Sequence, residues 1–81
     1  MSEKTIAAVR KNSREEIRVS LSEYRGHNLA ALRVWVDSDR SPERVPTPKG
    51  VTFNVALLPA LRAALAEAER EARAAGLLAD G

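Results

Sequence analysis

The sequence predicts an α+β fold in which a four-stranded, curved antiparallel sheet is followed by one C-terminal helix. Apolar and polar residues alternate over residues 16–22, β-forming residues fill 29–37, and apolar residues recur every three or four positions after residue 54. A period of two is typical of a strand with one buried face, whereas steps of three and four are typical of an amphipathic helix. A length of 81 residues fits one small domain.

Residues 1–13 show no sustained period, so we expect a flexible basic tail there and a folded domain over residues 14–78. Residues 1–14 hold four positive charges and one negative charge, residues 15–50 hold six of each, and residues 51–81 hold three positive and four negative charges. The basic excess therefore lies in the predicted tail. A tail of this kind adds non-specific attraction to phosphates.

The first predicted strand begins near Glu16, where Ile17, Val19 and Leu21 point to one face and the residues between them to the other. A turn follows over residues 24–28. We expect Gly26 to supply a positive φ in this turn, because residues other than glycine rarely adopt this conformation.

The second predicted strand, residues 29–37, has an apolar face and a mixed face that contains Arg33 and Trp35. The segment 37–48 is polar and rich in proline, so we expect a loop with at most a short third strand around Val45. A fourth short strand is predicted over residues 51–53.

The last predicted element is a helix with Asn54 as N-cap and Gly76 at its C-terminal end. Pro59 requires the helix to begin close to it, because proline lacks a backbone N–H. A chain this short buries little surface alone, so we expect a homodimer. The apolar stripe of the helix predicts its interface, formed by Leu58, Leu61, Leu65 and Ala68.

Composition argues against catalysis, metal binding and a membrane location. The sequence has no Cys and one His, His27, and no Ser lies in a Gly-x-Ser-x-Gly setting. We therefore expect no enzyme activity, no metal and no cofactor. No apolar run approaches a membrane span and no signal peptide is visible, so we expect a cytoplasmic, nucleoid-associated protein with no membrane partner.

Three segments in this order resemble the transcriptional positive-cofactor-four family: residues 17–27 with an aromatic-basic-Gly-basic turn, residues 32–35 with an apolar-Arg-x-aromatic strand, and residues 48–54 with Lys-Gly-apolar-Thr-apolar. The resemblance implies a homodimer with four antiparallel strands and a helix per subunit. It also implies that the curved sheets bind single-stranded DNA through phosphate contacts and base stacking, with little sequence preference. Bacterial relatives resemble this domain alone.

The resemblance also implies site residues. Tyr24 matches the turn aromatic, Arg33 the second-strand arginine and Lys49 the lysine before the last strand, whereas His27 stands where lysine is common. Trp35 could instead cover the sheet or the dimer interface. The predicted DNA-binding residues are Arg18, Tyr24, Arg25, Gly26, His27, Arg33, Trp35, Lys49 and Gly50.

We therefore predict a sequence-tolerant single-stranded DNA-binding homodimer that acts in transcription regulation or in DNA repair and replication. The transcription machinery is a further expected partner. Two alternatives are a protein-interaction module of coactivator or adaptor type, and an RNA-binding module on the same sheet. The salt dependence of affinity distinguishes the protein-interaction module from DNA binding, because binding to phosphates weakens steeply with salt and an apolar contact does not.

Overall fold

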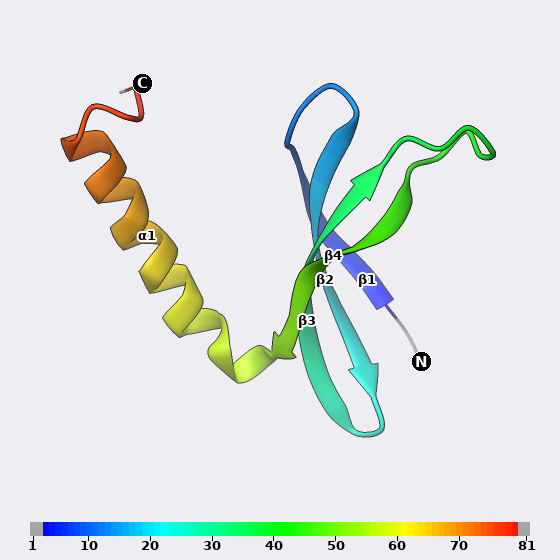
Figure 1. The fold of residues 1–81 in the computed structure, drawn as a ribbon. Helices are drawn as coiled ribbons and strands as arrows, with labels where there is room; N and C mark the ends of the chain where they lie inside the picture. Colours follow the sequence, from blue (N-terminus) through cyan, green and yellow to red (C-terminus); the bar gives the residue numbers. More distant parts are fainter. Residues whose placement is uncertain (1–2, 80–81) are drawn as a thin grey trace.

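The structure, a computed structural model, describes residues 3–79 and has the predicted α+β fold. Its four strands form one open antiparallel sheet in the order β1-β2-β3-β4, and a helix follows (Figure 1). The elements are β1 (Glu3–Arg10), β2 (Glu15–Tyr24), β3 (His27–Val36), β4 (Val45–Asn54), the short 3-10 helix η1 (Val55–Leu57) and α1 (Leu58–Ala74).

The prediction of a flexible tail over residues 1–13 is wrong for residues 3–10, which form the edge strand β1; residues 1–2 lie outside the described residues. β1 pairs with β2 along its length, but the register shifts between Thr5 and Ala7. Ile6 occupies this irregularity, so the alternation that normally marks a strand is interrupted. β1 is therefore recognised by its pairing with β2 and not by a pattern in its own sequence.

The prediction of two short strands near Val45 and over residues 51–53 is also wrong, because one strand, β4, covers both. β4 lies at the sheet edge, where prolines can be tolerated. Its pairing with β3 is irregular between Gly50 and Pro46, so Pro48 lies where the regular ladder is interrupted and Pro46 lies at the border of the interruption.

The turn between β2 and β3 lies where the sequence predicts it, with a positive φ at Gly26. Arg25 has φ 51° and Gly26 has φ 81°, so both central residues of this two-residue connection have positive φ. Such turns match the twist of the strands they join.

The start of the helical segment explains Asn54 and Pro59. The Asn54 side chain accepts a hydrogen bond of 2.8 Å from the Ala56 N–H and so caps η1, not α1 directly. α1 then begins at Leu58 with Pro59 in its first turn. A proline there forfeits no intrahelical hydrogen bond.

The end of α1 confirms the predicted role of Gly76. Gly76 has φ 75°, and its N–H donates to the Arg73 carbonyl at 3.1 Å. The Leu77 N–H donates to the Ala72 carbonyl at 2.8 Å. These two bonds form a Schellman motif, which requires a left-handed residue where the glycine stands.

The sheet has two chemically different faces. Directly paired residues share a face, so the pairs Ile17–Val34 and Val19–Leu32 place apolar side chains together. We call this side the apolar face; it comprises Val9, Ile17, Val19, Leu21, Ala30, Leu32, Val34, Val51 and Phe53. Among the described residues the buried hydrophobic side chains are those of Ala30 and Ala31. A single chain therefore has almost no core.

The helix α1 extends away from the sheet, and none of its residues is buried (Figure 1). A groove of about 640 Å³ separates it from the apolar face, and Val19, Leu32 and Phe53 line the sheet side of the groove. Its helical side is lined by Leu58, Pro59, Leu61, Arg62 and Leu65. Within residues 3–79, no helix has the length and apolarity needed to cross a bilayer.

Candidate nucleic-acid interface

The face of the sheet opposite the groove brings together most of the residues predicted to bind DNA. Arg18 pairs with Arg33 and Tyr24 pairs with His27, so these four side chains lie on one side. Trp35 pairs with Glu16 on the same side. We call this side the polar face; it comprises Arg10, Glu16, Arg18, Ser20, Tyr24, His27, Arg33, Trp35 and Thr52.

Arg33 lies near the middle of the polar face and is held by neutral groups. Its Nη1 donates to the Thr47 carbonyl at 3.0 Å, and its Nη2 donates to the Thr52 hydroxyl at 3.3 Å. No carboxylate in residues 3–79 forms an ion pair with it. The guanidinium is thus oriented by hydrogen bonds, and its charge remains available to an anion.

Gly50 has a structural role next to Arg33. It has φ 149°, and a Cβ atom at this position would lie 2.3 Å from the Leu32 carbonyl oxygen and 2.8 Å from the Arg33 Cα. Both contacts are with backbone, which cannot move aside easily. Gly50 therefore allows β4 to approach Arg33 closely, and this accounts for the glycine without any ligand.

Trp35 and Arg18 are stacked on each other. The Arg18 guanidinium carbon lies 3.9 Å from the centroid of the Trp35 ring, which is cation–π geometry. Arg18 is also paired with Glu16 through its Nε. Trp35 therefore lies on the polar face and is covered in part by Arg18, so the aromatic ring is not freely exposed.

The β2–β3 turn forms the opposite end of the polar face. Tyr24 is 46% exposed, and the Arg25 guanidinium carbon lies 5.1 Å from its ring centroid. The eight positions from Tyr24 to Glu16, the partner of Trp35, span about 26 Å at ~3.3 Å per residue. The polar face thus has an aromatic residue near each end and arginines between them.

Lys49 is exposed and lies in the irregular part of β4, where its N–H donates to the Thr47 hydroxyl at 3.2 Å. The pKa of Glu15 is lowered mainly by hydrogen bonds from Asn12 and Lys11, with a smaller contribution from the charge of Lys49. In the described part of the chain, the Lys49 side chain forms no ion pair with a residue of the polar face, and its role in binding stays a prediction.

Sequence reasoning missed Arg10, which β1 places on the polar face opposite Glu16. The positive charge of the N-terminal segment was the available signal, but the interrupted alternation concealed the strand. Arg44 was also missed, because it lies in a loop without a recognisable pattern. Its Nη1 donates to Glu16 at 2.7 Å and its Nε donates to Asp37 at 2.9 Å.

The pKa of Glu16 is lowered, first by the hydrogen bond from Arg18 and then by that from Arg44, although partial burial opposes this shift. The carboxylate is therefore ionised at neutral pH. Its charge lies between two arginines, so it weakens the positive character of the polar face less than an unpaired carboxylate would.

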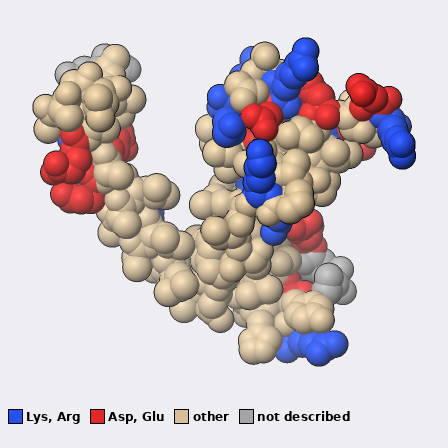
Figure 2. Space-filling view, viewed as in Figure 1, with Lys and Arg blue, Asp and Glu red and all other residues tan. Residues whose placement is uncertain are grey.

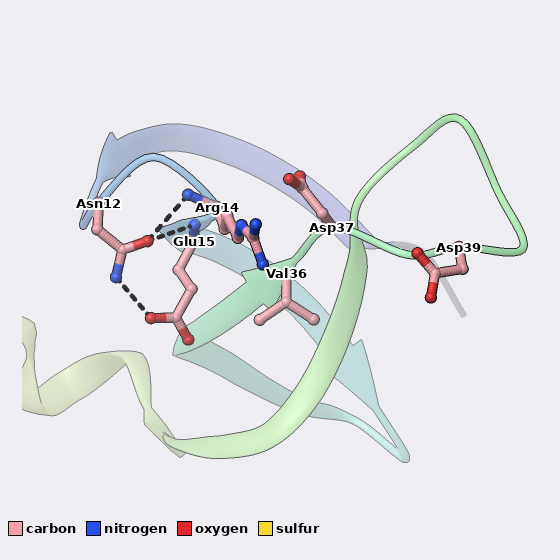
Figure 3. Close-up of a pocket in the computed structure, with 6 residues that line it drawn as sticks. All are labelled: Asn12, Arg14, Glu15, Val36, Asp37 and Asp39. Atoms are coloured by element: carbon pink, nitrogen blue, oxygen red, sulfur yellow. Dashed lines mark hydrogen bonds between the residues drawn. The ribbon is translucent and has the colours of Figure 1, made fainter.

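A separate depression of about 720 Å³ lies beside the β1–β2 turn (Figure 3). The side-chain Oδ1 of Asn12 accepts hydrogen bonds of 2.9 Å from the backbone N–H groups of Arg14 and Glu15, and its side-chain Nδ2 donates to the Glu15 carboxylate at 2.7 Å. These bonds, drawn in Figure 3, satisfy the side chain of Asn12 within the turn. They stabilise the turn and do not indicate a ligand site.

The predicted dimer residues lie on α1. Leu58, Leu61 and Leu65 line the groove, whereas Ala68 is exposed further along the helix. Figure 2 shows Lys and Arg side chains at both ends of the sheet, mixed with acidic side chains at its upper end, and acidic side chains on α1. By sequence, residues 3–54 carry ten positive and seven negative charges, whereas residues 55–79 carry three of each. Phosphates would therefore be attracted to the sheet in preference to the helix.

Comparison with known proteins gives a consistent result. Residues 11–64 match the family model described as Transcriptional Coactivator p15 (PC4). The chain is also similar to the orthorhombic crystal structure of BPSL1147, a PC4 homolog from Burkholderia pseudomallei K96243, with 36% identity and a TM-score of 0.79. That match covers 86% of this chain and 93% of the other. The tetragonal form of the same protein matches with 37% identity and a TM-score of 0.74, over 84% of this chain and 98% of the other.

A bacteriophage T5 homolog of the eukaryotic transcription coactivator PC4, implicated in recombination-dependent DNA replication, has the same fold. Its TM-score is 0.62 at 22% identity, and the match covers 95% of this chain and 85% of the other. A search of the curated proteins found no significant match.

Proposed function

Because the chain belongs to the transcriptional coactivator p15 (PC4) family, we propose that it is a non-enzymatic, sequence-tolerant single-stranded DNA-binding homodimer. We further propose that it acts in transcription regulation or in DNA repair or replication. The solved relatives support this choice, since one is a PC4 homolog and the phage homolog is implicated in recombination-dependent DNA replication.

The single observation that carries the proposal is the composition of the polar face. Arg33 and Arg18 offer donors to phosphates, and Tyr24 offers an exposed ring near one end. Phosphate contacts provide affinity without reading sequence, and any base can stack on an aromatic ring. This combination suits a single strand, whose bases are free to stack on protein, better than a duplex, whose bases are stacked inside.

The homodimer is supported by the thin core of one chain and by the uncovered groove. Leu65 is 64% exposed and Leu61 is 38% exposed, although both point to an apolar groove. Covering this surface with a second copy would remove several leucine side chains from water, at about 1.5–3 kcal/mol for each fully buried side chain. A small chain without disulfides gains most of its missing stability in this way.

A titration by fluorescence anisotropy tests the proposal. Matched single-stranded DNA, duplex DNA and RNA probes of several sequences are titrated over a salt series. We expect the tightest binding to single-stranded DNA, little dependence on sequence, and an affinity that falls steeply with salt. Equal affinity for duplex and single strand would contradict the proposal, and tighter binding to RNA would favour the RNA-binding alternative.

The apolar groove favours one second candidate, a protein-interaction module of adaptor type that contacts the transcription machinery. Its contacts would be made by the leucines of α1 and would depend weakly on salt. A chain that binds no nucleic acid at low salt, and whose dimer forms a stable complex with the transcription machinery, would support this candidate instead.

A further inference from the structure

The loop between β3 and β4 carries an arginine that joins three segments. Arg44 donates from Nη1 to the Glu16 Oε1 at 2.7 Å, from Nε to the Asp37 Oδ1 at 2.9 Å, and from Nη2 to the Ser13 carbonyl at 3.4 Å. Its side chain is only 22% exposed, and that of Glu16 is 15% exposed. Both groups are therefore protected in part from solvent. Because exposure to solvent weakens ion pairs, this protection favours the pair.

The Glu16 carboxylate is shared between two arginines in an ordered way. Its Oε1 accepts from Arg44, and its Oε2 accepts from the Nε of Arg18. The two Nη groups of Arg18 have no partner within residues 3–79, and the guanidinium lies 3.9 Å from the Trp35 centroid. Arg18 thus engages Glu16 by its inner nitrogen and presents its outer nitrogens beside the ring.

This arrangement depends on Oε1 being occupied. A free carboxylate accepts two parallel hydrogen bonds from one guanidinium, and this bidentate geometry is preferred for arginine. Without Arg44, the Oε1 of Glu16 would compete for an Nη group of Arg18 and would turn the guanidinium away from Trp35. It would also leave the Glu16 charge less compensated on a face where phosphates would bind.

We propose that Arg44 is a positioning residue for the polar face: by occupying Glu16 it keeps the Arg18 guanidinium over the Trp35 ring, with the outer nitrogens of Arg18 open to a phosphate of single-stranded nucleic acid. The proposal rests on the proposed function for its ligand. Arg44 itself need not contact the nucleic acid. Guanidinium planes also stack on bases, so the Arg18–Trp35 pair offers a stacking surface that Trp35 alone does not.

Three variants separate positioning from general charge. Arg44→Gln removes the guanidinium and its charge, whereas Arg44→Lys keeps the charge but cannot reproduce the several N–H donors of the guanidinium. Arg40→Gln is the matched control, because Arg40 lies in the same loop, is exposed and forms no ion pair within residues 3–79. Circular dichroism melts establish that each variant is folded at the temperature of measurement.

The first readout uses the free protein and requires no ligand. Trp35 is the single tryptophan of the sequence, so its emission reports the environment of this ring alone. Protons of Arg18 that lie over the ring are shifted upfield in nuclear magnetic resonance spectra. We expect both Arg44 variants to change the Trp35 emission and to reduce the upfield shift, while Arg40→Gln leaves both unchanged.

The second readout is affinity for single-stranded DNA. We expect Arg44→Gln to weaken binding roughly five- to tenfold, as for the loss of one charge-assisted contact, and Arg40→Gln to weaken it less than about twofold. Arg44→Gln should cost less in a Glu16→Gln background, because the neutral amide has no charge for Arg44 to compensate. This coupling between two positions in contact is measured by a double-mutant cycle.

Each contrary outcome has a definite meaning. Three outcomes would overturn the positioning role while leaving the proposed function intact. The first is wild-type behaviour of Arg44→Lys in both readouts, and the second is an equal loss of affinity for Arg44→Gln and Arg40→Gln. The third is an unchanged cost of Arg44→Gln in the Glu16→Gln background. Failure of the wild-type protein to bind any single strand would overturn the proposed function, and the role assigned to Arg44 with it.

Discussion

Arg33 and Tyr24 lie on the same face of the sheet but contribute differently to the proposed binding. Arg33 is oriented by the Thr47 carbonyl and the Thr52 hydroxyl and has no acidic partner within residues 3–79. Tyr24 is exposed in a tight turn and contacts Arg25. The first residue is suited to a phosphate and the second to a base, so substitutions at the two positions should be distinguishable.

Arg33→Gln should weaken binding to single strands of any sequence and reduce the salt slope by about one ion, because one phosphate contact is lost. Tyr24→Leu should weaken binding by about 1–3 kcal/mol and leave the salt slope unchanged, because only a stacking surface is lost. Anisotropy over a salt series measures both, and a duplex probe serves as the control. If Tyr24→Leu weakened duplex binding equally, the base-stacking role would have to be abandoned.

Gly50 allows two backbones to approach each other at the position of Arg33. Gly50→Ala would place a Cβ 2.3 Å from the Leu32 carbonyl oxygen, so β4 must shift. We expect a loss of about 2–3 kcal/mol in the free energy of unfolding, comparable to other strained backbone positions. Gly26→Ala is the control, because its Cβ meets nothing within 4 Å although its φ is positive. Urea denaturation should show the larger loss for Gly50→Ala, and an equal loss at both positions would argue against the close approach.

The ion pairs of Glu16 predict a dependence of stability on pH. Its pKa is lowered in the folded chain, first by Arg18, from an ordinary value of 4.5. A lowered carboxyl pKa contributes stability that is fully present above the unfolded value and is lost as the pH falls through the folded value. Glu16→Gln should therefore flatten the decline of the melting temperature below about pH 4.5. The residual decline would reflect Glu15, whose pKa is lowered too, and an unchanged decline would exclude the Glu16 contribution.

At the scale of elements, β1 has the most consequence for the sheet. It covers one edge of β2 and brings Arg10 to the polar face, although its sequence does not alternate regularly. An isolated segment of this kind would not be extended by its own preference. Pairing supplies the hydrogen bonds that hold it in the sheet.

Deletion of residues 1–10 should lower the melting temperature and weaken DNA binding, because it removes a paired strand and a cation on the polar face. The free edge of β2 would also favour aggregation. Thermal melts and light scattering measure these effects, with Lys4→Gln as a control that changes charge without removing pairing. A truncated chain that melts like the full-length protein would show that β1 contributes nothing to stability.

At the scale of the whole molecule, the chain consists of a sheet and a helix with an apolar groove between them. The groove is lined by leucines of α1, and no side chain of α1 is buried. The proposed homodimer would cover these leucines.

Leu65→Glu should convert the proposed dimer into an unstable monomer, because a charge buried in the interface without a partner costs several kcal/mol. Ala63→Glu is the matched control, since residue 63 lies on the opposite side of α1 from the stripe formed by Leu61 and Leu65. Sedimentation velocity at micromolar concentration measures the oligomeric state. A folded monomer for the unmodified protein, or dissociation by both variants, would contradict the predicted interface.

The sequence by itself determined the fold class, the β2–β3 turn and the end of the helix. Each depends on local chemistry: alternation in β2, the positive φ of Gly26 and the left-handed Gly76 after α1. Family resemblance added the predicted DNA-binding residues, and the register brings five of these nine residues together on the polar face.

Only the tertiary structure decided that residues 3–10 form β1, that β4 is continuous through its prolines, and that Arg44 binds Glu16. These features depend on pairing between residues far apart in the sequence. Arg44 and Glu16 are separated by 28 positions, and no local period relates them. Cross-strand register selects such contacts, and register is a property of the assembled sheet.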